Sequence, residues 1–490
     1  MTELAVRTGP RLLPDPRRVI AKLFVPGEET RDGNSRANAV VARILALPEA
    51  EVSVLAGAAI AEFGGRHPDL TGILARHFAV VAHAVPADQP LSADRRTVIG
   101  AYFTHEYAPE TAALFNPSMT EHPDQTGLDV GQIRFAMTVR CVGEGHLSSI
   151  GFRTGVLGPG SSIVVDDPEP VLVTGSSIPG PYRRHAFLSR LADVGVEPQN
   201  AQLLLGALPE TFSADELNGA LTGVHEHTLG RQRVQRAIAQ VMQVAYATYT
   251  VEFPTRPGLT GRLLWPGAPA ERNGMEDARL VRFAEGNGTI TYYAPFTAYD
   301  GAHVATHLLS TQDFRRFQMT PLAGRAARDK GLALFPRLIG GRYAALSRWD
   351  RENLSLAYSD DRQVWEESTI LHRPVRGWEL IQVGNGGPPI ETPDGWLVLT
   401  HGVGPMRQYA LGAMLLDLHE PSRVVATLTR PLLAPRADER DGYVPNVVYT
   451  CGAMLHDGVL TIPYGISDGA IGFAQADLAM LVSRMARAAA

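Results

Sequence analysis

The sequence predicts a mainly β protein: a five-bladed β-propeller with an N-terminal helical extension and a helical insertion in the first blade. Three observations predict this fold. A unit of three short strands recurs five times beyond the first hundred or so residues. The last four copies are almost evenly spaced. Two long stretches outside the repeats show the apolar period of amphipathic helices.

The second strand of each repeat is the most apolar and ends in a polar cluster. The five copies read IRFAMTVR, TITYYAPFTAYD, GRYAALSRWD, GWLVLTHGVG and GVLTIPYGISD, each with one strand before it and one closely after it. Markers in the first strands lie 161, 58, 53 and 58 residues apart: Asn116, Asp277, Phe335, Pro388 and Asn446. The last three intervals, of 58, 53 and 58 residues, are nearly equal and slightly longer than typical propeller blades of about 40–50 residues. A propeller would gather the polar strand ends at one mouth of its channel.

The helical patterns lie in two places. Residues 1–95 form the predicted N-terminal extension, whose apolar period ends at Pro86 and Pro90. The first repeat interval exceeds the others by roughly 100 residues, which places a helical insertion at about 170–255 within a propeller domain of residues 96–490. We expect the two helical parts to pack together beside the propeller, as a scaffold or as a contact between copies of the chain.

Composition narrows the class of protein. The 45 basic and 51 acidic residues give a net charge of -6 without a long basic run, so we expect no nucleic-acid partner. The two cysteines cannot form a disulfide framework. No signal-peptide core opens the sequence and no apolar run is long enough to span a bilayer, which predicts a cytoplasmic protein without a membrane partner.

Several positive side chains occur at or near predicted strand ends. Cations that converge on a small volume need an anion to be stable there, and arginine and lysine are the usual phosphate holders. The cationic set consists of Arg140, Arg153, Lys330 and His401. Alternatively, each pairs separately with a carboxylate such as Asp300 or Asp350. The histidines His146 and His185 lack metal-ligand spacing, so we expect no metal.

Glu276 and Asp277 put two carboxylates side by side. Neighbouring side chains of an extended strand point to opposite faces, so we expect only one of them to face a common target. We expect Glu276 to face the other side, where it anchors Arg279 or binds a sugar hydroxyl.

Six stretches of the sequence together resemble glycoside hydrolase family 130, the inverting β-mannoside phosphorylases and related β-mannosidases. They are FNPS at 115–118, SSIGFRTG at 148–155, GMEDARL at 274–280, KGLALFP at 330–336, GGPPIETPDGWLVLTHGV at 386–403 and GYVPNVVYTCGA at 442–453. They run through all five repeats in order. Two positions depart from the pattern: Ala278 stands in place of a proline, and Thr400 in place of a tyrosine.

The resemblance implies a mannoside pocket on the propeller axis, with Asp277 matching the catalytic acid. It places the cationic set of Arg140, Arg153, Lys330 and His401 where phosphorylase members hold phosphate. It also places Asn116 and Arg279 at sugar-pocket positions. The further candidates for substrate binding are Ser118, Glu276, Asp300 and Asp350.

A phosphorylase needs an acid and a cationic cradle, but no second carboxylate, because phosphate is already a nucleophile. The sequence therefore predicts inverting phosphorolysis of β-mannosides to α-mannose 1-phosphate and a shortened acceptor, with inorganic phosphate as co-substrate and no cofactor. An inverting β-mannosidase is the alternative, and it requires a carboxylate base facing Asp277, with Asp300 and Asp350 as first candidates. A non-catalytic sugar-binding propeller is the third reading.

Overall fold

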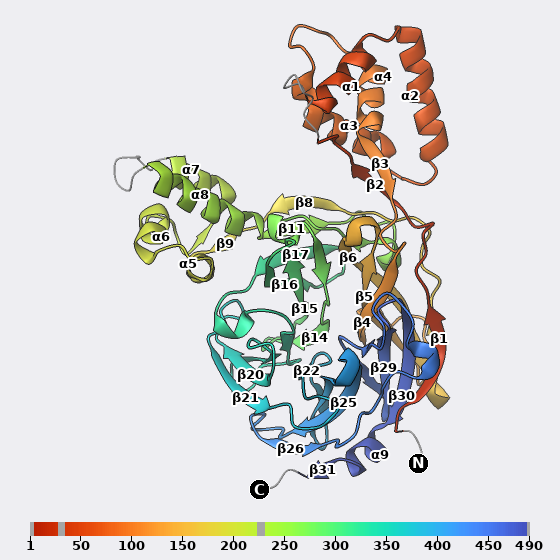
Figure 1. Cartoon of the computed structure of the whole chain (residues 1–490), viewed down its shortest axis with the longest axis vertical. Helices are drawn as coiled ribbons and strands as arrows, with labels where there is room; N and C mark the ends of the chain where they lie inside the picture. The colour runs from red at the N-terminus through yellow and green to blue at the C-terminus, as the bar shows by residue number, and fades with distance from the viewer. Residues whose placement is uncertain (1–3, 28–34, 223–230, 488–490) are drawn as a thin grey trace. The chain divides into compact units, whose positions relative to one another are not determined.

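The computed structural model describes residues 4–27, 35–222 and 231–487, and over these residues the protein is mainly β, as predicted (Figure 1). The chain divides into two compact units. One unit holds residues 1–14, 112–168 and 174–490 and most of the strands; the other holds residues 15–111 and 169–173. Parts of the predicted helical segments, at 28–34 and 223–230, lie outside the described residues.

All five predicted repeats form strands, and in each the second and third strands make an antiparallel hairpin. The hairpins are β5 (Ile133–Val142) with β6 (Ser148–Gly158), β15 (Ile290–Tyr299) with β16 (Val304–Thr311), β19 (Tyr343–Ser347) with β20 (Leu354–Ser359), β24 (Gly395–Val403) with β25 (Tyr409–Leu416), and β29 (Val459–Ile466) with β30 (Ala470–Asp477). The first strands pair with these hairpins as β4 (Ala113–Glu121), β13 (Gly274–Glu276) and β14 (Val281–Ala284), β18 (Ala333–Leu334), β23 (Ile390–Thr392), and β27 (Val448–Tyr449) and β28 (Met454–His456).

Further strands extend the repeats into larger sheets. They are β7 (Ser162–Val165), β8 (Ser176–Pro179), β11 (Tyr249–Glu252), β12 (Leu263–Leu264), β17 (Arg316–Pro321), β21 (Glu367–His372), β22 (Gln382–Asn385), β26 (Val424–Thr427) and β31 (Ala486–Arg487). The first two repeats share one sheet of 12 strands, because β13 pairs in parallel with β6. The other three repeats lie in sheets of four, six and five strands. The arrangement of the five repeats as propeller blades stays a prediction.

The first element of the described residues is a strand rather than a helix. Strand β1 (Val6–Leu12) pairs antiparallel with β30 of the last repeat, so residues 1–14 belong to the strand-rich unit. The prediction of one helical extension from residue 1 is wrong at this point. A seven-residue strand that contains Gly9 and Pro10 carries little period of its own, and the free edge of β30 decides its conformation.

Over its described residues, the helical unit contains four α-helices and a two-stranded sheet of β2 (Ile20–Leu23) and β3 (Thr104–Tyr107). The helices are α1 (Arg36–Leu45), α2 (Glu49–Phe63), α3 (Leu70–Val81) and α4 (Ala93–Tyr102). Helix α4 crosses the predicted boundary at residue 95, because it starts only after Pro90 and is capped by Ser92, whose Oγ accepts from the Arg95 N–H at 3.0 Å. No single described helix is long and apolar enough to cross a membrane; α1 and α2 meet that test only together, across a bend of 116°.

The insertion is helical where the sequence predicts helices, at α5 (Arg184–Asp193) and α8 (Arg231–Tyr246), and it also contains α6 (Pro198–Leu205) and α7 (Ala214–Thr222). It has an apolar core of its own around Phe187, Leu191 and Val241. Strands β8 and β11 pair with each other, and β11 pairs with β17 of the second repeat, so the insertion is built onto that sheet (Figure 1). Packing of the insertion against the N-terminal helices stays a prediction.

Apolar clusters join successive repeats. One holds Phe283 and Trp365 between the second and third repeats, one holds Phe335 and Trp396 between the third and fourth, and a third holds Leu399 and Ile462 between the fourth and fifth. Burying a large apolar side chain stabilises the fold by roughly 1.5–3 kcal/mol. These clusters fix the strand ends on which the polar side chains of the next section stand.

Candidate active site

Asp277 directly follows strand β13 and leaves the extended conformation. Its φ of 55° is left-handed, which ends the strand at Glu276. The alternation of an extended strand is therefore broken between the two residues, and both carboxylates reach Arg140: Glu276 Oε1 lies 2.6 Å and Asp277 Oδ1 lies 3.5 Å from its guanidinium nitrogens. The expectation that Glu276 faces the other side of the strand is wrong.

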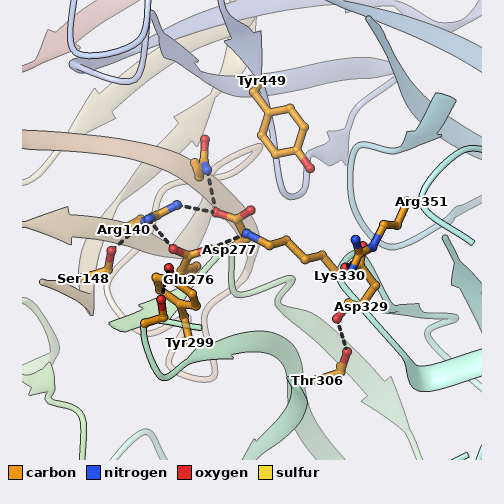
Figure 2. A network of polar contacts seen from close by, with 12 residues as sticks. Arg140, Ser148, Glu276, Asp277, Tyr299, Thr306, Asp329, Lys330, Arg351 and Tyr449 are labelled. Atoms are coloured by element: carbon orange, nitrogen blue, oxygen red, sulfur yellow. Dashed lines mark hydrogen bonds and ion pairs between the residues drawn. The ribbon is translucent and has the colours of Figure 1, made fainter. Parts of the chain in front are cut away.

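Arg140 stands near the end of β5 and holds the two carboxylates together (Figure 2). Its Nε donates to Ser148 Oγ at 3.0 Å, on the neighbouring strand β6, and its guanidinium lies 5.0 Å from the ring centre of Phe115. Glu276 and Asp277 raise the pKa of Arg140 although its burial opposes the charge. Arg140 is therefore a fixed cation at the centre of the cluster.

Lys330 contacts the carboxylate oxygen of Glu276 that Arg140 does not hold. Its Nζ donates to Glu276 Oε2 at 2.8 Å (Figure 2). The preceding residue, Asp329, is left-handed at φ 65° and is held by two contacts: its carbonyl accepts from Thr306 Oγ1 at 2.9 Å, and its carboxylate accepts from Arg351 Nε at 3.1 Å. Glu276 thus lies between two cations, and it does not anchor Arg279.

Asp277 is 9% exposed and accepts a hydrogen bond from Asn116 Nδ2 at 2.5 Å. Burial raises the pKa of Asp277, but the positive charges of Arg140, Arg279 and Lys330, with the hydrogen bond from Asn116, outweigh it. The net pKa lies below the ordinary value of a carboxyl group. Asp277 is therefore ionised in the free protein near neutral pH, and only the arrival of a negative ligand among these cations can favour its protonated form.

Arg279 is 2% exposed and connects Asp277 to the fourth and fifth repeats. It donates to the Asp277 carbonyl at 2.9 Å, to Asn385 Oδ1 at 3.2 Å and to the Tyr449 hydroxyl at 2.7 Å. All three contacts are buried. Arg279 therefore positions the backbone of Asp277 and lies behind it.

His401 is 2% exposed and lies against Tyr449, with 4.8 Å between the ring centres. Its Nδ1 is 2.9 Å from the Asn385 carbonyl, so Nδ1 carries the proton and Nε2 is an acceptor. Burial, followed by the charge of Arg348, lowers the pKa of His401 to about 3. His401 is therefore neutral in the free protein, and the prediction that it adds a positive charge is wrong for that state.

Arg348 is the cation that the sequence argument left out of the set. Its NH1 donates to His401 Nε2 at 3.5 Å, and its Nε is buried without a hydrogen-bond partner. Among the described residues no carboxylate lies within ion-pair distance of Arg348. The only sequence signal was its place at the end of a repeat's second strand, next to Trp349 and Asp350.

Arg153 is not brought to the cluster. In the β5–β6 pair, Arg140 lies opposite Ile150 and Met137 lies opposite Arg153. Ile150 and Arg153 are three residues apart on β6, so their side chains point to opposite faces of the sheet. Because Ile150 shares the face of its partner Arg140, Arg153 lies on the face opposite to Arg140. Its NH1 donates to the Phe152 carbonyl at 2.9 Å, and the side chain is 3% exposed.

Three of the residues predicted to bind substrate make local hydrogen bonds, and their role in binding stays a prediction. Ser118 is fully buried, and its Oγ accepts from the Leu280 N–H at 2.9 Å. Asp300 accepts from the N–H groups of Ala302 and His303 at 2.8 and 2.7 Å. Asp350 caps its own turn, accepting from the Asn353 N–H at 2.9 Å and from the Asn353 side chain at 2.7 Å. Neither Asp300 nor Asp350 pairs with a member of the cationic set.

A cavity of about 910 Å³ opens beside this cluster, and Lys330, Arg348, Tyr409 and Asp300 are among its lining residues. Its size is near the upper end of the range of roughly 300–1,000 Å³ for small-molecule sites. Within the described part of the chain, no three histidine, cysteine or acidic side chains are grouped so that they could hold a metal ion.

A carboxylate buried among cations beside a polar cavity is typical of an enzyme. The model of the family described as beta-1,4-mannooligosaccharide phosphorylase, glycoside hydrolase family 130, matches residues 234–487. The chain belongs to that family, as the sequence motifs predicted, and it is an enzyme. The match begins inside α8, so most of the helical insertion lies outside it.

Characterised relatives agree with this family. The chain is 34% identical over 208 residues to a 1,2-beta-oligomannan phosphorylase of Thermoanaerobacter sp. (strain X514), which covers 42% of this chain and 68% of the relative. It is 32% identical over 212 residues to a beta-1,2-mannobiose phosphorylase of Listeria innocua, covering 42% and 58%. A structure of beta-1,2-mannobiose phosphorylase from Listeria innocua with beta-1,2-mannobiose is similar at 22% identity and a TM-score of 0.46, over 76% of this chain and 92% of that one.

Proposed function

We propose that this enzyme catalyses the inverting phosphorolysis of β-mannosides, which gives α-mannose 1-phosphate and a shortened saccharide. Asp277 is the general acid, and Arg140, Lys330 and Arg348 form the phosphate cradle. The observation that carries the proposal is the surplus of positive charge around Asp277. Family membership and the phosphorylase names of the relatives support the substrate class.

The charge balance fits a phosphate dianion. Burial raises the pKa of Asp468, which lies near Arg140, to about 7, and below that pH Asp468 is neutral. Four cations then face two carboxylates around the site, which leaves two positive charges; the residues are Arg140, Arg279, Lys330 and Arg348 against Glu276 and Asp277. An uncompensated pair of charges in a partly buried site is costly unless an anion enters. Hydrogen phosphate carries the charge that neutralises it.

The reaction balances without a further reagent. A phosphate oxygen forms a bond to the anomeric carbon on the face opposite to the leaving oxygen, and the glycosidic C–O bond breaks, so a β-linkage gives an α-product. The leaving oxygen takes a proton from Asp277. Hydrogen phosphate has one proton that the sugar phosphate dianion lacks, so the overall reaction returns a proton to Asp277. The low pKa of Asp277 in the free protein suits this order, because phosphate must enter before the carboxyl group can hold a proton.

His401 serves the cradle as a neutral group. Its Nε2 accepts from Arg348, so it orients that guanidinium toward the cavity and adds no charge of its own.

We also propose that the five repeats close into a five-bladed propeller, with the N-terminal extension and the insertion as additions. Parallel bridges between neighbouring repeats support this arrangement: Gly274 with Ser148, Ala284 with Arg337, Tyr409 with Val447, and Gly452 with Ser118. The last bridge joins the fifth repeat to the first, as a closed ring requires.

An inverting β-mannosidase is the second candidate, because Glu276 turns out to face the same site as Asp277. A base must be free to take a proton from water. Both oxygens of Glu276 are engaged, one by Arg140 and one by Lys330, which favours the phosphorylase.

The test is product analysis with and without phosphate. The protein is incubated with β-1,2- and β-1,4-linked mannotriose, and free mannose and mannose 1-phosphate are quantified separately. We expect mannose 1-phosphate to form only with phosphate, and its first-formed anomer to be α by NMR. Release of free mannose alone at the same rate without phosphate would make the protein a hydrolase. No turnover of either substrate would count against both readings.

A further inference from the structure

The helical insertion forms part of the wall of the cavity beside the active site. Besides Lys330 and Arg348, the cavity of about 910 Å³ is lined by Arg190 and Asp193 of α5 and by Gln240 and Gln243 of α8. The insertion is therefore next to the proposed phosphate cradle and is more than a distant scaffold.

This wall is held in place by contacts with the loop that leads to Lys330. Asp193 accepts from the Gly324 N–H at 2.8 Å and lies 3.6 Å from the Arg328 guanidinium. Helix α8 is tied to the end of α5 by Gln240, whose side chain donates to the Val194 carbonyl at 2.9 Å. The insertion and the loop before Lys330 thus share fixed contacts, which keep the wall at a defined distance from the cradle.

The cavity is lined by different groups at the cradle and beside the insertion. At the cradle stand Lys330 and Arg348, where an anion is needed. Beside the insertion, Asp193 lies 3.9 Å from Arg190 and 3.6 Å from Arg328, so a carboxylate acceptor and two guanidinium donors stand together there. The side-chain amide of Gln243 is exposed there and can both donate and accept. A ligand rich in hydroxyl groups matches such a surface.

We infer that α5 and α8 form a binding subsite for the saccharide that leaves in the reaction, and that this subsite selects acceptors of two or more sugar rings. The inference rests on the proposed function. The cavity volume of about 910 Å³ is near the upper end of the range for small-molecule sites, and α5, which lines it, precedes the match to the family. The insertion thereby sets the acceptor preference of this chain.

The experiment runs the reaction backwards, with α-mannose 1-phosphate as donor and either mannose or mannobiose as acceptor. The variants are Gln243→Ala, which removes the amide, and Gln243→Trp, which fills the subsite. Gln235→Ala is the matched control, because Gln235 is exposed on the same helix and does not line the cavity. Gln243 has an exposed side chain, so the variants should fold.

We expect Gln243→Ala to raise the KM for mannobiose roughly fivefold to tenfold, as the loss of a neutral hydrogen bond predicts, and to leave the KM for mannose 1-phosphate unchanged. Gln243→Trp should lose most activity with mannobiose and keep that with mannose. Wild-type KM values for mannobiose in both variants would overturn the inference.

Calorimetric titration of mannobiose separates this inference from the reaction itself. If the wild type binds mannobiose, the Gln243 variants bind it more weakly and no phosphate is released, then the subsite stands and the proposed reaction is wrong. If phosphate is released but the variants bind mannobiose as the wild type does, then the reaction stands and the subsite is wrong. If the wild type neither binds nor uses mannobiose, both are wrong.

Discussion

Replacing Lys330 with alanine should weaken phosphate binding far more than saccharide binding. Lys330 contributes one of the two surplus positive charges, and its Nζ holds Glu276 Oε2 at 2.8 Å. Without the lysine, Glu276 keeps only Arg140 as a partner, and more of its negative charge faces the incoming anion. The surplus falls from two charges to one, so hydrogen phosphate is no longer fully neutralised.

The size of the effect follows from the exposure of the side chain. Losing a charge-assisted hydrogen bond costs about 1.5–3 kcal/mol, which is roughly tenfold to 150-fold in affinity. The Lys330 side chain is 36% exposed, so solvent screens part of this interaction. We therefore expect the lower part of the range, an increase of about tenfold to thirtyfold in the phosphate KM.

A second substitution tests the charge argument directly. In the double variant Lys330→Ala/Glu276→Gln, one cation and one carboxylate are removed together, and the surplus returns to two. We expect the double variant to recover a large part of the phosphate affinity that Lys330→Ala loses. A purely structural role of Lys330 would give no such recovery.

The assay is the initial rate against phosphate concentration at saturating mannotriose, with mannose 1-phosphate quantified. Arg315→Ala is the control, because Arg315 is an exposed cation at the turn between β16 and β17. An unchanged phosphate KM in Lys330→Ala, or an equal rise in the control, would refute the cradle.

Three further predictions concern the titratable groups. Asp277→Asn should fold normally and lose about 10²–10⁴-fold in kcat, because the leaving oxygen no longer receives a proton; circular dichroism and product formation check this, and a variant that kept more than roughly a tenth of the activity would mean another acid. Burial raises the pKa of Asp468 to about 7, so above that pH its negative charge beside Arg140 should weaken phosphate binding. Asp468→Asn should therefore reduce the rise in phosphate KM between pH 6 and pH 8. A variant with the same pH dependence of KM as the wild type would contradict this. Burial holds the folded pKa of His401 near 3, below 6.5, so its contribution to stability is present above pH 6.5 and is lost as the pH falls toward 3. Unfolding of His401→Gln in urea should therefore depend less on pH in that window than unfolding of the wild type, whereas the exposed control His303→Gln should match the wild type.

The repeats could be predicted from the sequence because their signals are local. Each repeat signal lies within about 25 residues of chain and consists of an apolar second strand, its polar end and a third strand close behind. The structure contains all five predicted hairpins. Helices α5 and α8 of the insertion and α1, α2 and α3 of the N-terminal unit followed in the same way from the 3.6-residue period, whereas α4, α6 and α7 were not predicted. Strand β1 did not, because its partner β30 lies more than 450 residues away in sequence.

The membership of the site depended on tertiary structure. The sequence placed Arg140, Lys330 and Asp277 at strand ends, and the fold does bring these three to Glu276 or to each other. It could not show that Asp277 turns left-handed, which brings Glu276 to the same side. Nor could it show that Arg153 leaves its sheet on the opposite face.

The charge states of the site residues were the property that the sequence determined least. A histidine and an arginine at neighbouring strand ends look alike as cations, yet burial leaves His401 neutral while Arg348 remains charged without a carboxylate partner among the described residues. The kinds of residue and their order along the chain were fixed by the sequence itself. Which of them carry charge toward one point was decided by the packing of the repeats, because a pKa depends on the solvent and the charges that the fold places around each group.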